Sequence, residues 1–383
     1  MRIKIRKTAA AVLFCVGMLV LCSCGKGEDE TGGKKYIGVA YYNQSDTFLN
    51  ELLDSFREQL KELQGQDMET VVMIRDAAGS QRTQDDQVKE LIDAGCDVLC
   101  VNLVDRADPS EIIDLAREQN VPIIFFNREP VAEDLMQWDG LYYVGAEAEE
   151  SGRMQGELAA DMIRADSEID KNHDGKIQYV VLEGEVGHQD AIIRTETVVE
   201  TLIGQGIELE KLSNQIANWN RAQAENRMEQ LLGQYHSQIE LVLANNDDMA
   251  LGALDAYRKL NYTESALPAF FGIDGTDEGL EAVMDSEIAG TVYNDKEGQA
   301  GAMARLSLAL LTGKGMDEIE FQKERCIYLP YEKVTEGNVS EFLLRSRKAA
   351  GSESRRVEKE GIFRRPGARK SPLFYSRRQQ KTC

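Results

Sequence analysis

The chain has 383 residues, enough for two domains, and its 44 basic and 66 acidic side chains give a net charge of −22. Such acidity argues against a nucleic-acid partner. Four of the seven cysteines lie within the first 24 residues or at the C-terminus, and the odd three that remain do not form a disulfide framework.

The N-terminus has the features of a lipoprotein signal. Four basic residues in the first seven positions precede an apolar stretch, residues 9–21, that is too short for an ordinary spanning helix. Leu21, a small residue at Ser23 and then Cys24 match the lipidation motif, which implies cleavage after residue 23 and an extracytoplasmic, lipid-anchored protein. An ordinary secretory signal and lipidation of Cys22 are the alternatives. Residues 24–34 indicate a flexible tether.

Strand-like and helix-like segments then alternate. Strands are expected at 36–41, 70–74, 98–103 and 121–126, with helices at 48–63, 81–94 and 110–119. The pattern restarts after 142–144, with helices at 150–163, 190–202, 221–232 and 249–260 and strands at 177–182 and 241–244. Cys100, inside an apolar run, should be a buried hydrophobic residue. Repeated strand–helix units predict parallel sheets covered on both faces, and two such series predict two lobes that close around a small ligand.

Polar and aromatic side chains stand where these apolar runs stop. They are Asp46, Phe48, Asn102, His188, Asp190, Arg194, Trp219, Asn246, Asp274 and Asn294. The carboxyl ends of strands are where open α/β sheets bind ligands. Amides, carboxylates and an arginine suit sugar hydroxyls, and aromatic faces suit sugar C–H groups, so the set predicts a monosaccharide receptor. Taken singly, Phe48 and Trp219 could be core aromatics and His188 a structural cap.

Residues 170–178 follow the spacing of a calcium loop. Oxygen donors stand at positions one, three, five, seven and nine, namely Asp170, Asn172, Asp174, the Lys176 carbonyl and Gln178. Gly175 at position six suits the sharp turn. Position twelve is Val181 rather than the usual Glu, so a closing carboxylate must come from elsewhere, and Glu240 is the candidate. The alternative is an Asx-rich turn without a metal.

The last segment, residues 345–383, is basic, with thirteen basic and three acidic side chains. It has no helical or strand period. A disordered tail or a spurious extension of the reading frame is expected, with a lipid- or wall-binding tail as the alternative.

Several blocks together carry a family resemblance. They are residues 37–39 with 46–48, 102–105, 125–130, 149–152, 184–190, 244–247, 272–274 and 291–295. Over about residues 35–344 the chain resembles the glucose/galactose-binding members of the periplasmic binding proteins of bacterial ABC sugar transporters. The resemblance implies the type I α/β fold of two lobes joined by a three-segment hinge. The lobes would hold residues 35–126 plus 295–328 and residues 127–294 plus 329–344.

The resemblance also implies roles for the residues named above. Asp46 would meet the sugar 4-hydroxyl and so accept either epimer, Phe48 and Trp219 would stack on the two faces, and Arg194 would donate to the ring oxygen. The other six residues would complete the hydrogen-bonding shell, and the loop with Glu240 would hold a structural Ca²⁺. Thr47 and Gln189 depart from the family pattern beside the site, which could alter affinity or anomer preference.

Three functions are weighed. The first is delivery of glucose or galactose to an ABC permease, and the second is presentation of the sugar to a chemoreceptor or kinase. The third, a glycosidase, needs two carboxylates flanking a glycosidic oxygen. Asp46, Asp190 and Asp274 are better interpreted as hydroxyl acceptors that Arg194 and the amides keep ionised, so no enzyme is expected. The lipidation motif and the lack of an N-terminal helix-turn-helix disfavour a transcription regulator.

Overall fold

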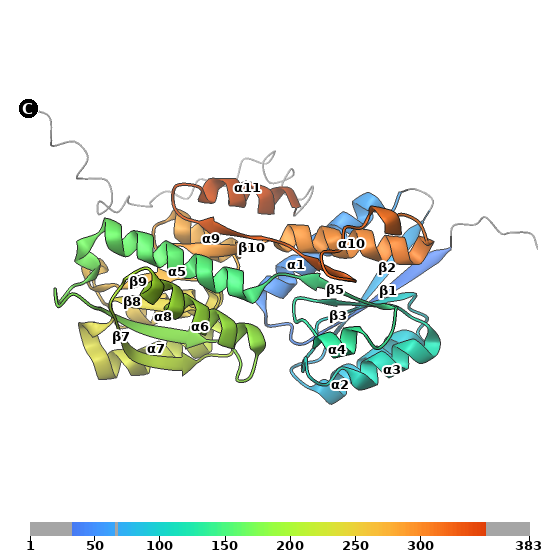
Figure 1. Cartoon of the computed structure of the whole chain (residues 1–383), viewed down its shortest axis with the longest axis horizontal. Helices are drawn as coiled ribbons and strands as arrows, with labels where there is room; N and C mark the ends of the chain where they lie inside the picture. The colour runs from blue at the N-terminus through green and yellow to red at the C-terminus, as the bar shows by residue number, and fades with distance from the viewer. Residues whose placement is uncertain (1–32, 66–67, 350–383) are drawn as a thin grey trace, which may run out of the picture.

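The computed structural model describes residues 33–65 and 68–349. They form two α/β lobes that follow one another along the long axis of the molecule (Figure 1). The first sheet has six strands in the order β11-β5-β4-β3-β1-β2, and the second has four in the order β7-β6-β8-β9. All neighbouring strands in both sheets are parallel, as the strand–helix alternation predicts.

The first lobe has helices on both faces of its sheet. Its strands are β1 (Lys34–Tyr41), β2 (Glu69–Asp76), β3 (Val98–Val101), β4 (Ile123–Phe126), β5 (Leu141–Gly145) and β11 (Cys326–Tyr328). On one face lie α1 (Thr47–Leu63) and α10 (Lys296–Thr312), and on the other α2 (Gln81–Asp93) and α3 (Ser110–Gln119). The short α4 (Ala132–Leu135) precedes β5. Cys100 is fully buried in this sheet, which confirms the prediction for that residue.

The second lobe repeats the plan. Its strands are β6 (Ile177–Glu183), β7 (Leu209–Ile216), β8 (Leu241–Ala244) and β9 (Ala269–Phe271). On one face lie α5 (Ala148–Ala165) and α6 (Gln189–Gly204), and on the other α7 (Arg221–Tyr235), α8 (Asp247–Lys259) and α9 (Asp277–Met284). Single 3-10 turns occur in this lobe at Ser167–Ile169, His236–Gln238 and Glu264–Ala266, and in the first lobe at Met316–Glu318.

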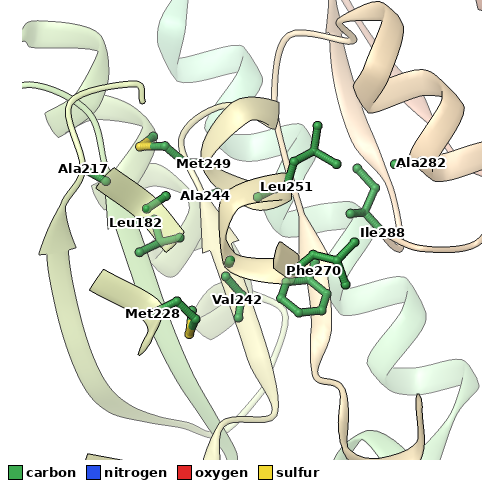
Figure 2. Close-up of a cluster of buried hydrophobic side chains, with 14 of the residues drawn as sticks. Leu182, Ala217, Met228, Val242, Ala244, Met249, Leu251, Phe270, Ala282 and Ile288 are labelled. Carbon is green, nitrogen blue, oxygen red and sulfur yellow. The ribbon is translucent and has the colours of Figure 1, made fainter. Parts of the chain in front are cut away.

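Two further strands extend this lobe. β10 (Thr291–Asn294) continues the sheet beside β9 through single bridges and pairs antiparallel with β12 (Tyr331–Val334). The last helix, α11 (Val339–Ala349), packs against α9. The core between the sheet and α7, α8 and α9 is apolar, with Val242, Phe270 and Met249 among its buried side chains (Figure 2).

The chain crosses between the lobes three times. The first crossing lies between the end of β5 at Gly145 and the start of α5 at Ala148. The expected boundary after residue 126 is wrong, because β5 pairs with both β4 and β11 in the first sheet. The turn that begins at Asn127 leads back into the same lobe. The other crossings join β10 to α10 and β11 to β12.

The C-terminal boundary also needs correction. α11 continues through Arg345 to Ala349, so a tail without secondary structure does not begin at residue 345. Arg345 forms an ion pair with Glu332, and Ser346 is buried. The signal at 1–23, Cys24 and residues 350–383 lie outside the described residues, as does the tether except for its last two residues. Within the described part, no helix has the length and apolar character needed to cross a bilayer.

Candidate functional site

Arg194, on α6, is at the centre of the second-lobe part of the site. It is 4% exposed. Its Nη1 donates to the backbone carbonyl of Asn245 at 2.8 Å and lies 3.6 Å from Asp274 Oδ1, while Nη2 donates to the Tyr331 hydroxyl at 3.1 Å. Its Nε is buried and has no hydrogen-bond partner among the described residues. Because buried donors are normally paired, an oxygen of a bound molecule is the natural partner for this Nε–H.

Trp219 lies beside Arg194 in the turn between β7 and α7. Its indole is so close to Gly184 that a Cβ at that glycine would lie 2.1 Å from the ring. Its φ of +58° is in the left-handed region, which is uncommon for a bulky residue and typical of functional strain. The His188 ring meets the indole edge-on at a centroid distance of 5.2 Å, and Arg194 Cζ lies 5.8 Å from the indole centroid.

Asn246 and Asp274 follow the ends of β8 and β9, Asn294 is the last residue of β10, and all three are buried. Asn246 caps α8 by accepting from Met249 N at 3.0 Å, and its amide nitrogen lies 3.4 Å from the Trp219 carbonyl. The Asn294 backbone N–H donates to the Asp274 carbonyl at 3.1 Å. The φ of Asp274 is +113°, a second strained backbone position. Neighbouring parallel strands therefore bring these side chains to one edge of the sheet, as the sequence predicts.

In the first lobe, Tyr42 connects two of the predicted sugar contacts. Its hydroxyl donates to Asp46 Oδ2 at 2.7 Å, and its backbone N–H donates to Asn102 Oδ1 at 3.3 Å. Asp46 also caps α1 by accepting from Leu49 N at 2.9 Å. Each Asp46 oxygen thus has one protein donor and retains capacity for a second, such as a sugar hydroxyl.

Phe48, which was predicted to stack on the sugar, lies in the apolar core of the first lobe. It is 4% exposed and belongs to the apolar cluster that α1 and α10 form on the first sheet. Its place is the one expected of the first buried residue of a helix. Stacking of Phe48 on a ligand stays a prediction.

Residues of the two lobes act on each other electrostatically at this site. Burial is the main cause of the raised pKa of Asp274 in the second lobe, and the charge of Asp46 in the first lobe adds to the same shift. The charge of Arg128 in the first lobe lowers the pKa of both His188 and Asp190 in the second lobe. The ion pair of Arg128 with Glu185, at 2.9 Å, joins the two lobes beside these residues.

Burial, rather than ion pairing, dominates the titration of this cluster. Desolvation raises the pKa of Asp190 and holds that of Asp274 well above its ordinary value, although the charge of Arg194 opposes both shifts. Burial therefore outweighs the effect that was expected of Arg194 and the amides on these two carboxyl groups. Burial, and then the charges of Arg128 and Arg194, hold the pKa of His188 well below its ordinary value.

The tautomer of His188 follows from its contacts. Because its pKa is depressed, the imidazole is neutral at pH 7. Its Nδ1 accepts from Asp190 N at 3.1 Å, so the proton resides on Nε2. His188 therefore offers one N–H donor to a ligand.

Sequence reasoning missed four residues that support this site: Tyr42, Arg128, Asn245 and Tyr331. Tyr42 holds Asp46, Asn245 and Tyr331 accept from Arg194, and Arg128 crosses between the lobes to Glu185 at 2.9 Å. Their sequence signal is weak because their partners are protein groups that are mostly far away in the chain. For Arg128, an arginine directly after a buried strand was the available clue.

A model of the periplasmic binding protein domain matches residues 37–315. The chain belongs to this periplasmic binding protein family. Membership confirms the two-lobed α/β fold with parallel sheets flanked by helices. Proteins of this family bind solutes outside the cytoplasm and are not enzymes, and this holds for the present chain.

Named relatives of this periplasmic binding protein differ in ligand. The D-galactose/methyl-galactoside binding periplasmic protein of Haemophilus influenzae is 35% identical over 336 residues, which cover 87% of this chain and 98% of that protein. A putative rhizopine-binding protein of Rhizobium meliloti is 31% identical, with 80% of this chain and 92% of that protein covered.

Solved structures agree on the fold. An ABC transporter solute binding protein from Bacillus halodurans with bound myo-inositol is 27% identical and superimposes with a TM-score of 0.68, covering 82% of this chain and 99% of that one. One from Actinobacillus succinogenes with bound D-allose is 19% identical, with a TM-score of 0.67 and coverage of 80% and 99%.

The predicted calcium loop of this periplasmic binding protein lies on the second lobe, between α5 and β6. Its side chains contact one another: Asn172 Nδ2 donates to Asp174 Oδ2 at 3.1 Å, and Gln178 Nε2 donates to the same oxygen at 3.0 Å. Glu240 is 1% exposed and accepts the backbone N–H of Lys171 at 2.7 Å and of Gln178 at 3.0 Å. The expected closing carboxylate is therefore bound to the loop.

The donor set of this loop fits a hard cation such as Ca²⁺. Rotation of the Asn172 and Gln178 amides by 180° would turn their oxygens, in place of the nitrogens, toward Asp174. Within the described residues no three His, Cys, Asp or Glu side chains gather closely enough to hold a metal alone. A cation here would depend on amide and backbone oxygens as well as on carboxylates.

Proposed function

We propose that the protein captures a hexose, D-glucose and/or D-galactose, between its lobes and delivers it to an ABC transporter. The observation that carries this proposal is the buried Arg194 Nε–H, which has no acceptor among the residues that the structure describes and lies in a shell of carboxylates and amides beside Trp219. A pyranose supplies both a ring oxygen for that donor and an apolar face for the indole.

The choice of hexose rests on Asp46. A carboxylate that retains acceptor capacity can receive a 4-hydroxyl from either side, so it does not discriminate strongly between the two epimers. The galactose named for the Haemophilus influenzae relative supports the proposal, whereas the inositol and allose bound to the solved structures show that this fold accepts other ligands. Presentation of the bound sugar to a chemoreceptor or kinase would use the same capture step.

A melting-temperature screen tests this proposal. A ligand at a hundredfold excess over its Kd adds about 2.7 kcal/mol to the free energy of unfolding, so galactose and glucose should each raise the melting temperature. Ribose, xylose and myo-inositol at equal concentration should raise it less. A larger rise with a pentose would contradict the hexose assignment.

We further propose that the protein is anchored to the membrane through a lipid on Cys24, which follows a lipoprotein-type signal. Cys24→Ala should abolish lipidation and either release the protein from the membrane fraction or leave its precursor unprocessed. Fractionation followed by immunoblotting measures this. A cleaved Cys24→Ala product that stays with the membrane would indicate Cys22 or the basic C-terminal segment as the attachment.

We also propose that the loop at residues 170–178, with Glu240, binds a structural Ca²⁺. Support comes from the oxygen spacing, the left-handed φ of +84° at Gly175 and the contacts that join the loop to Glu240.

A further inference from the structure

A partly buried ion pair joins the two lobes beside the candidate sugar site. Arg128 follows β4 in the first lobe, and Glu185 follows β6 in the second. Arg128 Nη2 donates to Glu185 Oε2 at 2.9 Å, and the two side chains are 4% and 33% exposed. Since hinged lobes separate when a ligand leaves, the opening motion would separate this pair.

The two partners of this ion pair differ in how firmly they are held: Arg128 is fixed within its own lobe, whereas Glu185 is partly exposed to solvent. Arg128 is held within its own lobe, because Nη1 donates to the Val104 carbonyl at 3.0 Å and Cζ lies 3.5 Å above the Tyr42 ring centroid. The guanidinium is therefore preorganised before Glu185 arrives. Glu185, one third exposed, can regain water on opening.

Each partner is connected to predicted sugar contacts of its own lobe. Tyr42, beneath the guanidinium, donates to Asp46, and its backbone N–H donates to Asn102. The positive charge above the ring makes the Tyr42 hydroxyl a better donor to Asp46. Glu185 accepts the backbone N–H of His188 through its carbonyl at 3.1 Å. Closure of the pair thus fixes a contact residue in each lobe.

We propose that Arg128 and Glu185 form a latch that holds the lobes closed around the sugar, and that Tyr42 is a positioning residue that couples this latch to Asp46. The inference rests on the proposed function, because the latch acts only on a ligand held between the lobes. In this proposal Arg128 and Glu185 control the rate of ligand release without having to contact the ligand.

Rapid-mixing kinetics with galactose and glucose test the latch. Glu185→Gln keeps the size of the side chain and removes its charge. It should raise Kd about tenfold, mainly through faster dissociation, because the pair is made after encounter. The melting temperature of the sugar-free protein should stay within about 2 °C of wild type. Glu183→Gln is the matched control, since Glu183 bonds to Asn214 within the second lobe, and it should release sugar at the wild-type rate.

Two further variants separate a latch from a local structural role. Glu185→Gln in an Arg128→Gln background should have no additional effect on the dissociation rate. Tyr42→Phe should weaken binding with the ion pair intact, because Asp46 loses a donor. Wild-type kinetics in Glu185→Gln, with sugar binding by the wild-type protein, would overturn the latch alone. Failure of the wild-type protein to bind either hexose would overturn the proposed function, and the latch with it.

Discussion

Trp219→Ala should weaken hexose binding by roughly 2–4 kcal/mol, about 30-fold to 1000-fold in Kd, because a buried aromatic anchor loses its whole face. The indole comes from a strained turn and lies against His188 and Arg194, and its ring leaves no room for a Cβ at Gly184, which follows β6. Stability should fall less than affinity. The strain of the left-handed φ remains, because alanine also carries a Cβ, so the loss of stability reflects only the packing that the 8%-exposed Trp219 makes with the second-lobe core. Calorimetric titration and thermal melting measure the two quantities separately.

The chain contains only two tryptophans, which gives a matched control. Trp138 packs against the first-lobe core and is not one of the predicted contacts. Trp138→Phe should keep wild-type affinity and the sugar-induced change in tryptophan fluorescence, whereas Trp219→Phe should lose that change. A Trp219→Ala protein with unchanged hexose affinity would return Trp219 to the role of a core aromatic.

Removal of calcium should lower the melting temperature without weakening sugar binding. A cation at a hundredfold excess over its Kd contributes about 2.7 kcal/mol to folding. The loop at residues 170–178 lies at the amino end of β6, whereas the second-lobe sugar contacts lie at the carboxyl ends of strands. Chelation should therefore destabilise the protein, and added Ca²⁺ should restore it. Asp174→Ala should abolish the response. Asp174 is exposed, and the Lys176 N–H holds its pKa below the ordinary value, so its carboxylate is ionised at neutral pH.

Glu240→Ala needs a separate interpretation. Glu240 accepts backbone N–H groups of the loop, so its loss should destabilise the protein even in the presence of chelator. The informative quantity is the remaining calcium response, which should disappear if Glu240 is a ligand. A wild-type melting curve that is indifferent to chelator would remove the metal assignment altogether. A calcium response that persists in Glu240→Ala would require another closing carboxylate.

The hydrophobic pattern of the sequence predicts the strongly apolar strands of this fold. It misses a polar edge strand and misplaces one crossing between the lobes, each for a physical reason. β3, β4 and β8 are buried strands with short apolar sequences, and all three were expected. β7 was not, because Leu209–Ile216 is a largely polar edge strand with several exposed side chains. The first crossing was misplaced because the turn at Asn127 gives no sign that the chain returns to pair β5 with β4.

The residues of the candidate site likewise fall into those that the sequence could predict and those that it could not. Polar residues directly after buried strands, such as Asn102, Asn246 and Asp274, could be found because the ends of parallel strands meet at one edge. Tyr42 and Arg128 could not be assigned, because their significance depends on contacts with Asp46 and with the other lobe. Phe48 shows the opposite problem, since an aromatic residue at the start of an amphipathic helix suits both a core and a stacking role.

Isothermal titration of the purified protein with galactose, glucose, ribose, xylose and myo-inositol tests the central claim most directly. We expect one saturable site for galactose or glucose, with a Kd in the micromolar range or tighter, equivalent to about −8 kcal/mol or beyond. The pentoses and the inositol should bind more weakly. Binding of ribose, xylose or myo-inositol with no measurable heat from either hexose would contradict the assignment of this protein as a glucose or galactose receptor.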